Sequence, residues 1–252
     1  MVKFSVCLEP LLSDLELCDR IKVAADIGFQ GVEIWDPIGK NVDKIGKKAL
    51  ESGIPVIGCC LLDQWGIRAN AETSTILKNL EKTIDFASAM DCKSFILLTG
   101  DVETKFDTQK STLIYNLLHM TEIAEKRDVT LMLEPLNSYV DHKGYYLDSA
   151  HVGFEIVRAV DSKRVKLLYD CYHMQIMEGN LIDTMTKNIS HIGHVHCAGV
   201  PGRNEIFNGE INYNDVIKNL DKIGYDHYVG VEYWPTYDDI QSLRDTIEYL
   251  KG

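Results

Sequence analysis

Eight short apolar runs alternate along this chain with segments of helical periodicity. The runs are continuously apolar, which is typical of parallel strands that are buried on both faces. Apolar residues at helical spacing follow the runs, as from Leu17 to Ala25, and Gly28 can end that helix. Eight strand–helix units in 252 residues predict an α/β fold, a (β/α)8 TIM barrel with residues 1–252 in a single domain. The expected strands are 4–8, 31–35, 55–61, 93–99, 129–134, 165–170, 192–197 and 228–233.

Helices are expected between these strands and after the last one. A doubly wound open sheet is the structural alternative, but no glycine-rich fingerprint follows the first strand. Asp148 is the expected N-cap of the fifth helix. The expected helices are 15–27, 42–50, 71–90, 108–126, 148–160, 181–187, 213–223 and 238–250.

The charge and the cysteines restrict the class of partner. A formal net charge of -12 repels phosphate backbones and anionic membranes, so we expect neither nucleic acid nor a membrane as a partner. The 7 cysteines are scattered, and no CxxC pair occurs, which indicates reduced thiols in a cytoplasmic protein. No run has the length of a signal peptide core or a membrane span. We expect a homo-oligomer that acts on a small molecule.

Four consecutive strands end on residue types that bind metals. These residues are Glu134, Asp170, His196 and Glu232. In a barrel the carboxyl ends of the strands meet at one mouth, so the four side chains would converge there. Three carboxylates and one imidazole favour Mn²⁺, Mg²⁺ or Co²⁺, with Zn²⁺ as a further candidate. Each acid taken alone could equally cap a helix, and His196 alone could be a hydrogen-bonded core histidine.

Several neighbouring residues have two interpretations each. His194 shares the strand parity of His196 and lies one layer deeper, so it is interpreted as a core histidine or as support for a ligand. Glu33 could bind substrate or pair with a base, and Asn137 could fix Glu134 or form a turn. By parity, Cys171 and Cys197 should face the helices. The tryptophans Trp35, Trp65 and Trp234 could line a sugar pocket or pack in the core.

Six short segments in order along the chain carry a family resemblance. They are GFQGVE at 28–33, LEPLN at 133–137, GYYL at 144–147, DCYH at 170–173, PGRNE at 201–205 and GEINY at 209–213. On these segments the chain resembles the xylose-isomerase-like superfamily of sugar isomerases and epimerases, and within it the hydroxypyruvate isomerase branch. The resemblance implies one divalent cation held by Glu134, Asp170, His196 and Glu232. It also implies that His173 and Arg203 bind the substrate, and that Glu134 and Glu232 transfer protons.

Two positions depart from that branch. Hydroxypyruvate isomerases often have Gln where this chain has His196, whereas ketose 3-epimerases have His there. Those epimerases usually carry Glu six places after the first metal-binding Glu, where this chain has Val140, followed by Asp141. The resemblance therefore leaves open a hydroxypyruvate-type keto acid or a short sugar as the substrate.

The residue types define the chemistry expected of such a site. A cation polarises the carbonyl of an α-hydroxy-carbonyl substrate and stabilises an enediolate once the α-carbon loses its proton. Return of the proton to the neighbouring carbon gives isomerisation, and return to the opposite face of the same carbon gives epimerisation. The alternatives are a ketose 3-epimerase, a dehydratase, an apurinic-site endonuclease and a barrel that only binds sugar. Substrate contacts are expected from His173, Arg203, Glu33, Asn137 and Trp35.

Overall fold

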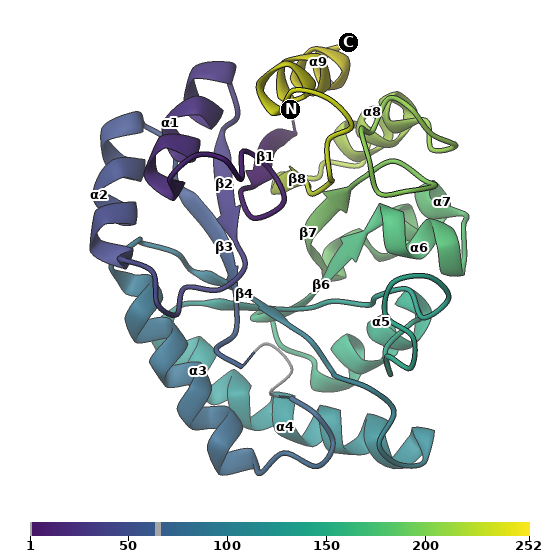
Figure 1. Ribbon diagram of the computed structural model, residues 1–252. Coiled ribbons are helices and arrows are strands. Elements are labelled where there is room, and N and C mark those ends of the chain that lie inside the picture. The colour runs from purple at the N-terminus through teal and green to yellow at the C-terminus, as the bar shows by residue number, and fades with distance from the viewer. Residues whose placement is uncertain (1, 64–66) are drawn as a thin grey trace.

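The computed structural model describes residues 2–63 and 67–252 of the chain, so Trp65 lies outside the described residues. Within them, eight parallel strands pair in chain order, and the last pairs with the first to close a barrel. Helices surround this barrel on all sides, as the view along its axis shows (Figure 1). The prediction of a (β/α)8 barrel is confirmed. The strands are β1 (Lys3–Cys7), β2 (Gly31–Ile34), β3 (Val56–Cys60), β4 (Ser94–Leu97), β5 (Thr130–Leu133), β6 (Val165–Asp170), β7 (Ile192–Cys197) and β8 (Tyr228–Val231).

The helices match the expected segments with two differences. A helix that the sequence analysis did not predict, α6 (Cys171–Met177), begins directly at the end of β6. The N-cap of α5 is Ser149 and not Asp148, because the Ser149 hydroxyl accepts the backbone N–H of Val152. The other helices are α1 (Leu17–Ile27), α2 (Val42–Ser52), α3 (Thr73–Ser88), α4 (Phe106–Arg127), α5 (Ala150–Val160), α7 (Leu181–Asn188), α8 (Tyr213–Lys222) and α9 (Asp239–Lys251), with a 3-10 turn η1 (Ile189–His191). None of the helices in the described part of the chain is long and apolar enough to cross a membrane.

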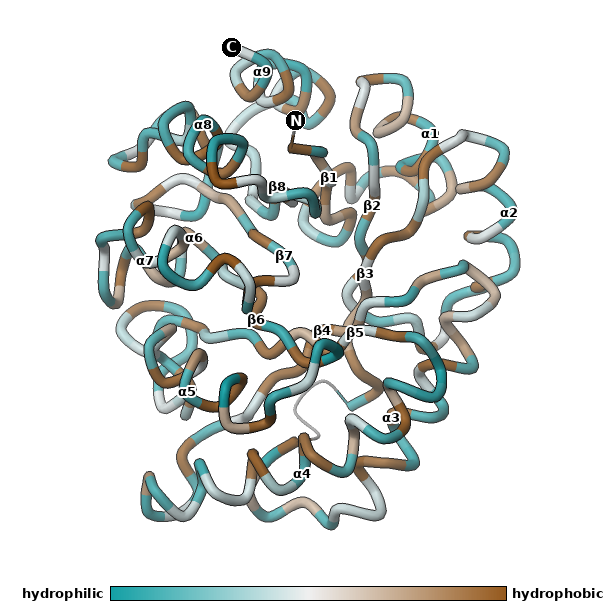
Figure 2. The backbone as a smooth tube through the Cα atoms, turned by 180° about the vertical axis from the view of Figure 1, so that it is seen from behind, coloured by the Kyte–Doolittle hydropathy of each residue, from teal (hydrophilic) through white to brown (hydrophobic). Residues whose placement is uncertain are grey.

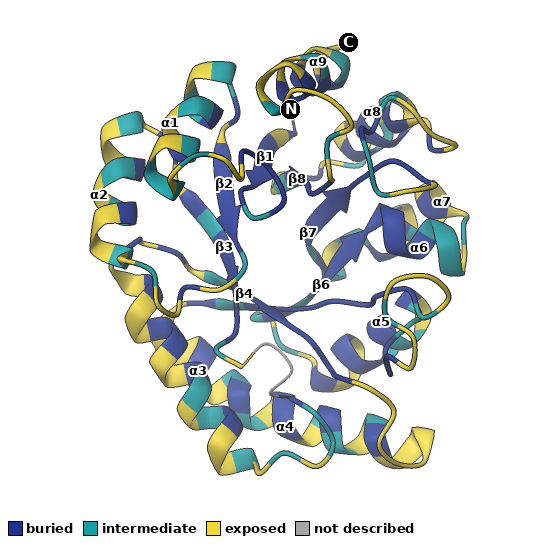
Figure 3. Cartoon of the chain, in the orientation of Figure 1, coloured by how far each residue is buried: buried dark blue, intermediate teal, exposed yellow. Residues whose placement is uncertain are grey.

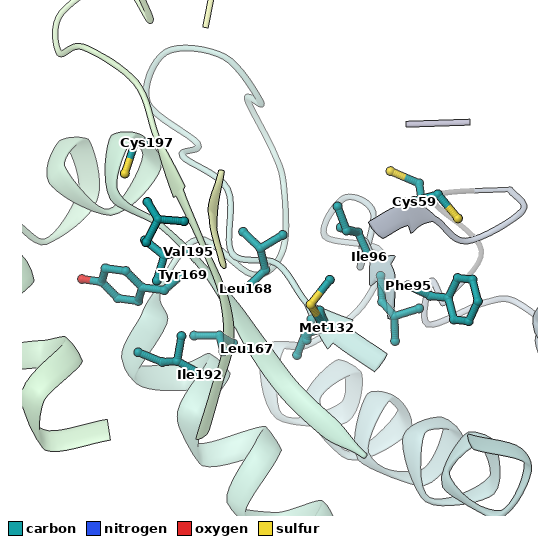
Figure 4. Close-up of a cluster of buried hydrophobic side chains, with 14 of the residues drawn as sticks. Cys59, Phe95, Ile96, Met132, Leu167, Leu168, Tyr169, Ile192, Val195 and Cys197 are labelled. Carbon is teal, nitrogen blue, oxygen red and sulfur yellow. The ribbon is translucent and has the colours of Figure 1, made fainter. Parts of the chain in front are cut away.

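The apolar core fills the space between the barrel and its helices. Each helix is apolar on the face toward the barrel and polar outside, so hydropathy alternates along the helices in Figure 2 and burial follows it in Figure 3. On β6, Tyr169 and Leu168 point to opposite sides of the strand (Figure 4). Tyr169 stacks on Phe154 of α5 at 6.4 Å. Cys197 lies with Cys171 on this outer side, against Tyr213 of α8, as parity predicted.

The barrel interior holds a polar layer, and a glycine makes room for it. Gly230 of β8 lies opposite His196 of β7 in the sheet. A side chain at Gly230 would place its Cβ 2.9 Å from His194 Nε2 and closer still to the carboxylate of Glu33. The absence of a side chain at Gly230 therefore lets Glu33 and the two histidines share the centre of the barrel.

Replacing Gly230 should consequently destabilise the protein. We expect Gly230→Ala to cost about 1–3 kcal/mol, as is typical of overpacked interiors. The matched control is Gly58→Ala on β3, where an added Cβ would meet nothing closer than 3.8 Å. Denaturant unfolding of the two variants measures the difference. Equal stability of the two would contradict this account of the interior.

Candidate metal centre and active site

The four predicted ligands converge at the carboxyl end of the barrel. Glu134 and Glu232 directly follow β5 and β8, while Asp170 and His196 lie in the last two residues of β6 and β7. All four side chains are buried. His196 Nδ1 lies 3.9 Å from Glu134 Oε1 and 3.7 Å from Glu232 Oε2. One donor atom each from Asp170, His196 and Glu232 lies within 4.8 Å of the others, as is also true of Glu134, Asp170 and His173.

Asp170 divides its two carboxylate oxygens between the fold and the site. Oδ1 accepts the backbone N–H of Tyr172 at 2.7 Å and that of His173 at 3.3 Å, so Asp170 is the N-cap of α6. Oδ2 faces the site, 3.7 Å from an Arg203 nitrogen and 3.6 Å from His173 Nε2. The cap fixes the orientation of the carboxylate, which leaves Oδ2 available to a ligand.

The donor set fits a divalent cation. His196 Nδ1 is buried, faces two carboxylates and has no hydrogen-bond partner among the described residues. A buried polar atom without a partner is costly unless a ligand satisfies it. Three carboxylates around one imidazole form an oxygen-rich site that suits Mn²⁺ or Mg²⁺, and the imidazole also suits Zn²⁺.

Arg203 supplies positive charge to this cluster in the structure described here. Its guanidinium forms an ion pair with Glu232 and lies over the rings of Tyr172 and Trp234, at 5.3 and 5.1 Å from the ring centres. Its backbone adopts φ 56°, a left-handed conformation that costs a non-glycine residue about 1–3 kcal/mol and is frequent at functional sites. Trp35 Nε1 donates to the other oxygen of Glu232 at 2.5 Å.

The surroundings shift the pKa values of the two glutamates in opposite directions. Burial raises the pKa of Glu134 to about 8, and the charges of Glu232 and Asp170 contribute to this rise. Burial also acts to raise the pKa of Glu232, but Arg203 and His196 outweigh it and lower the pKa. Without a cation, Glu134 therefore holds a proton at neutral pH while Glu232 is ionised.

His196 and Asp170 are shifted by the same buried cluster. Burial acts to lower the pKa of His196, yet the carboxylates of Glu33 and Glu232 raise it to about 10. Burial raises the pKa of Asp170, and Arg203 and His196 offset part of that rise. The imidazolium of His196 therefore partly compensates the carboxylates when no cation is bound.

His173 lies on α6 and is fully buried. The backbone N–H of Asn137 donates to His173 Nδ1 at 3.1 Å, and the Asn137 side-chain amide lies 2.7 Å from the same atom. In neutral His173 the ring hydrogen is then on Nε2, which faces Asp170. Burial lowers the pKa of His173 well below its usual value, and Arg203 lowers it further. His173 therefore presents a neutral N–H donor to the site.

Asn137 holds the loop after β5 together. Its side-chain oxygen accepts the backbone N–H groups of Val140 and Asp141 at 3.0 and 2.9 Å, and its side-chain nitrogen donates to Asp141 Oδ2 at 2.8 Å. All polar atoms of the side chain are used in these contacts and in the contact with His173. Asn137 thus fixes His173, while Glu134 is not among its hydrogen-bond partners.

A cavity of about 200 Å³ lies at the mouth of the barrel, and of the four predicted ligands Glu134 and Glu232 line it. Trp35 and Trp234 form one wall, with ring centres 6.3 Å apart. His142, from the loop after β5, also lines the cavity; its ring centre lies 5.4 Å from that of His173. The sequence offered no signal for His142, because nothing local distinguishes it from other loop histidines. The lining is Trp35, Cys60, Ile96, Leu98, Glu134, Leu136, His142, His173, Arg203, Glu232 and Trp234.

Glu33 is buried beneath this site on β2 and does not line the cavity. Its Oε2 accepts from His196 Nε2 at 2.8 Å, and its Oε1 lies 3.1 Å from His194 Nε2. The sequence left open whether Glu33 binds substrate or pairs with a base, and in the structure it pairs with the two histidines. Among the expected substrate contacts, the structure thus brings His173, Arg203 and Trp35 to the cavity and leaves Glu33 and Asn137 behind it.

Comparisons with known proteins agree with the barrel fold and identify its family. The family described as xylose isomerase-like TIM barrel matches residues 21–252. The hydroxypyruvate isomerase of Escherichia coli K12 is 30% identical over 97% of this chain and 98% of its own length. The 2-oxo-tetronate isomerase of Pectobacterium atrosepticum is 29% identical over 93% of each chain. A crystal structure of an AP endonuclease, family 2, from Brucella melitensis has a TM-score of 0.92 at 26% identity and covers 99% of both chains.

A bound cation should stabilise the fold. At a Mn²⁺ concentration of 100 times its dissociation constant, we expect a gain of about 2.7 kcal/mol, read as a rise in the melting temperature. The Asp170→Asn variant should lose this response, because it keeps an oxygen to cap α6 but removes the charge. The control is Asp128→Asn at the exposed end of α4, where φ is 55° and Asn is tolerated. An Asp170→Asn protein that Mn²⁺ stabilises as strongly as the wild type would exclude Asp170 as a ligand.

Cation affinity should also rise with pH. His196 and Glu134, with pKa values raised to about 10 and about 8, hold protons that a cation must displace. The affinity for Mn²⁺ should therefore increase from about pH 6 to about pH 8, by about tenfold per pH unit for each proton displaced. Titration calorimetry in two buffers with different ionisation enthalpies counts the released protons. A pH-independent affinity without proton release would contradict the pKa shifts.

Proposed function

The chain belongs to the xylose isomerase-like TIM barrel family, and from this premise we propose that it is an isomerase of a small α-hydroxy-carbonyl compound. The preferred substrate class is a short keto acid of the hydroxypyruvate type. The observation that carries the proposal is the convergence of three buried carboxylates and His196 Nδ1 beneath a small cavity. The isomerase names of the similar curated proteins support the same reaction class.

A single divalent cation is part of this proposal. Glu134, Asp170, His196 and Glu232 would hold it, and Mn²⁺ or Mg²⁺ suits their oxygen-rich set. When bound, the cation supplies Lewis-acid polarisation of the substrate carbonyl and charge stabilisation of an enediolate.

Glu134 and Glu232 are the proposed proton-transfer groups. Both line the cavity, and a cation bound beside them would lower the pKa of each carboxyl group, so that either is ionised and can act as a base. One of these carboxylates takes the proton from the hydroxyl-bearing carbon, and the carboxylic acid so formed, or the other glutamate once that proton has passed to it, returns a proton to the neighbouring carbon. The hydroxyl proton passes to the former carbonyl oxygen, so the product is an isomer with the carbonyl moved by one carbon.

Arg203 and His173 orient the substrate in this scheme. Arg203 is the one permanently charged cation among the described residues that line the cavity, so it pairs with the carboxylate of a keto acid. When the substrate binds, Arg203 releases Glu232 and pairs with the substrate carboxylate instead, which leaves Glu232 free to accept a proton. His173 donates its Nε2–H to a substrate oxygen. Trp35 and Trp234 cover the C–H faces of the substrate and limit the access of water.

Two of the alternatives, the ketose 3-epimerase and the apurinic-site endonuclease, are weaker on specific observations. Val140, at the position where ketose 3-epimerases carry a glutamate, is 65% exposed and does not line the cavity, which favours isomerisation over 3-epimerisation. A net charge of -12 opposes DNA binding and so disfavours an apurinic-site endonuclease. A dehydratase would use the same enediolate but would release water.

Screening short keto acids and ketoses with Mn²⁺ or Mg²⁺ in deuterium oxide tests the reaction class. NMR should detect an isomer of a keto acid that carries deuterium at the carbon that gained the proton. A product lighter by one water would instead indicate a dehydratase. Inversion at one carbon of a ketose, without movement of the carbonyl, would instead indicate an epimerase.

Replacing either proton-transfer residue should abolish most of the turnover. We expect Glu134→Gln and Glu232→Gln to reduce kcat by about 10²–10⁴-fold, the usual contribution of general acid–base catalysis. The control is Glu155→Gln, since Glu155 pairs with Lys110 on the outer surface of the helices. Steady-state kinetics at saturating Mn²⁺ measures the loss. Full turnover by either site variant would remove that residue from the mechanism.

A further inference from the structure

Glu33 connects three strands across the centre of the barrel. Its Oε2 accepts from Nε2 of His196 on β7 at 2.8 Å, and its Oε1 accepts from the hydroxyl of Ser5 on β1 at 2.7 Å. Nε2 of His194 lies 3.1 Å from the same Oε1. All four side chains are buried. Both oxygens of Glu33 are therefore committed to protein groups.

This arrangement determines which nitrogen of His196 faces the site. A carboxylate only accepts hydrogen bonds, so the contact with Glu33 keeps a hydrogen on His196 Nε2. The other ring nitrogen, Nδ1, then points toward Glu134 and Glu232 with no hydrogen-bond partner in the described part of the chain. In neutral His196, Nδ1 is thus the nitrogen whose lone pair is available to a ligand.

Two cavities lie on opposite sides of this layer. The cavity at the mouth is lined by Glu134 and Glu232, and a second cavity of about 310 Å³ is lined by Glu33 and His194 together with Met132 and Tyr228. Among the described residues, none lines both cavities. Glu33 is therefore separated from the substrate by the histidine that it holds.

We propose that Glu33 is a positioning residue, which holds His196 so that Nδ1 is presented to a cation at the mouth of the barrel. The inference rests on the proposed cation site but requires no particular substrate. Carboxylates that hold a metal-binding histidine through its second nitrogen set the ring orientation and tautomer, and their loss commonly costs 10–100-fold in metal affinity. Ser5 and His194 hold the carboxylate in turn.

The test compares two replacements of Glu33. Glu33→Leu removes the acceptor and should weaken Mn²⁺ binding by about 10–100-fold. Glu33→Gln keeps an oxygen that can accept from His196 and should recover most of the affinity. The electron paramagnetic resonance signal of free Mn²⁺ gives both affinity and stoichiometry. The control is Thr83→Ala on α3, a helix that contributes no residue to the proposed cation site or to the lining of the mouth cavity. This change removes a buried hydroxyl that accepts from the backbone N–H of Leu62, so it should lower stability without changing Mn²⁺ affinity.

A second readout needs neither cation nor substrate. Long-range ¹H–¹⁵N NMR of the cation-free protein identifies the hydrogen on each nitrogen of His196. In the wild type and in Glu33→Gln the Nε2 hydrogen should be hydrogen-bonded and exchange slowly with water, whereas in Glu33→Leu it should exchange faster. If Glu33→Leu does not fold, Ser5→Ala replaces it, because it frees one side of the carboxylate and should weaken Mn²⁺ binding several-fold. Unchanged affinity and an unchanged His196 spectrum in the folded variants would overturn the proposal.

Other outcomes separate this proposal from its alternatives. Glu33, His194 and His196 could themselves hold a second cation, reached from the lower cavity. Two Mn²⁺ ions per chain, one of them lost in His194→Ala, would overturn the positioning role. A wild type that binds one Mn²⁺ but converts no substrate would refute the proposed reaction and leave the role of Glu33 intact. A wild type that binds no cation would refute the cation site and this proposal with it.

Discussion

The electrostatic repulsion among three buried carboxylates is the constraint around which this site is built. Glu134 and Glu232 each have a carboxylate oxygen within 4.8 Å of Asp170, in a buried region where like charges are costly. In the cation-free protein this cost is offset by the positive charge of Arg203, by the positive charge that the raised pKa gives His196, and by a proton on Glu134. These three devices are what a divalent cation would replace. The same arrangement that strains the cation-free protein therefore favours binding of a cation.

The barrel makes this cluster possible because it separates two kinds of packing. Apolar side chains of one strand parity pack outward against the helices, and the other parity faces the interior. The interior can then hold a polar layer without weakening the contact between helices and strands. Gly230 illustrates the dependence, since the space that its missing side chain leaves is occupied by Glu33 and the histidines. The apolar contacts between helices and strands stabilise the fold, so the interior and the mouth of the barrel can carry polar residues.

The sequence predicts the parts of this structure that local patterns encode. Continuous apolar runs identify the strands, and their last residues identify Glu134, Asp170, His196 and Glu232 as a converging set. The short helix α6 was not predicted because it follows β6 without a loop and has only 7 residues. The contacts of Glu33 with His196 and of Asn137 with His173 could not be predicted, because the partners lie across the barrel or on the helix α6, far away in the sequence. Register shifts, such as the one between Leu167 and Leu168, decide which side chains meet.

The loops, and not the strand ends, distinguish this site from others on the same barrel. The proposed acid and imidazole ligands come from strand ends, whereas the groups that would recognise the rest of a substrate come from the segments after them. Asn137 ties the loop after β5 to His173, and the strained backbone at Arg203 aims its guanidinium at Glu232. Val140 does not line the cavity, and the loop contacts place the guanidinium of Arg203 and the neutral imidazole donor of His173 at the mouth. A small anionic substrate is better matched to that lining than a long neutral sugar.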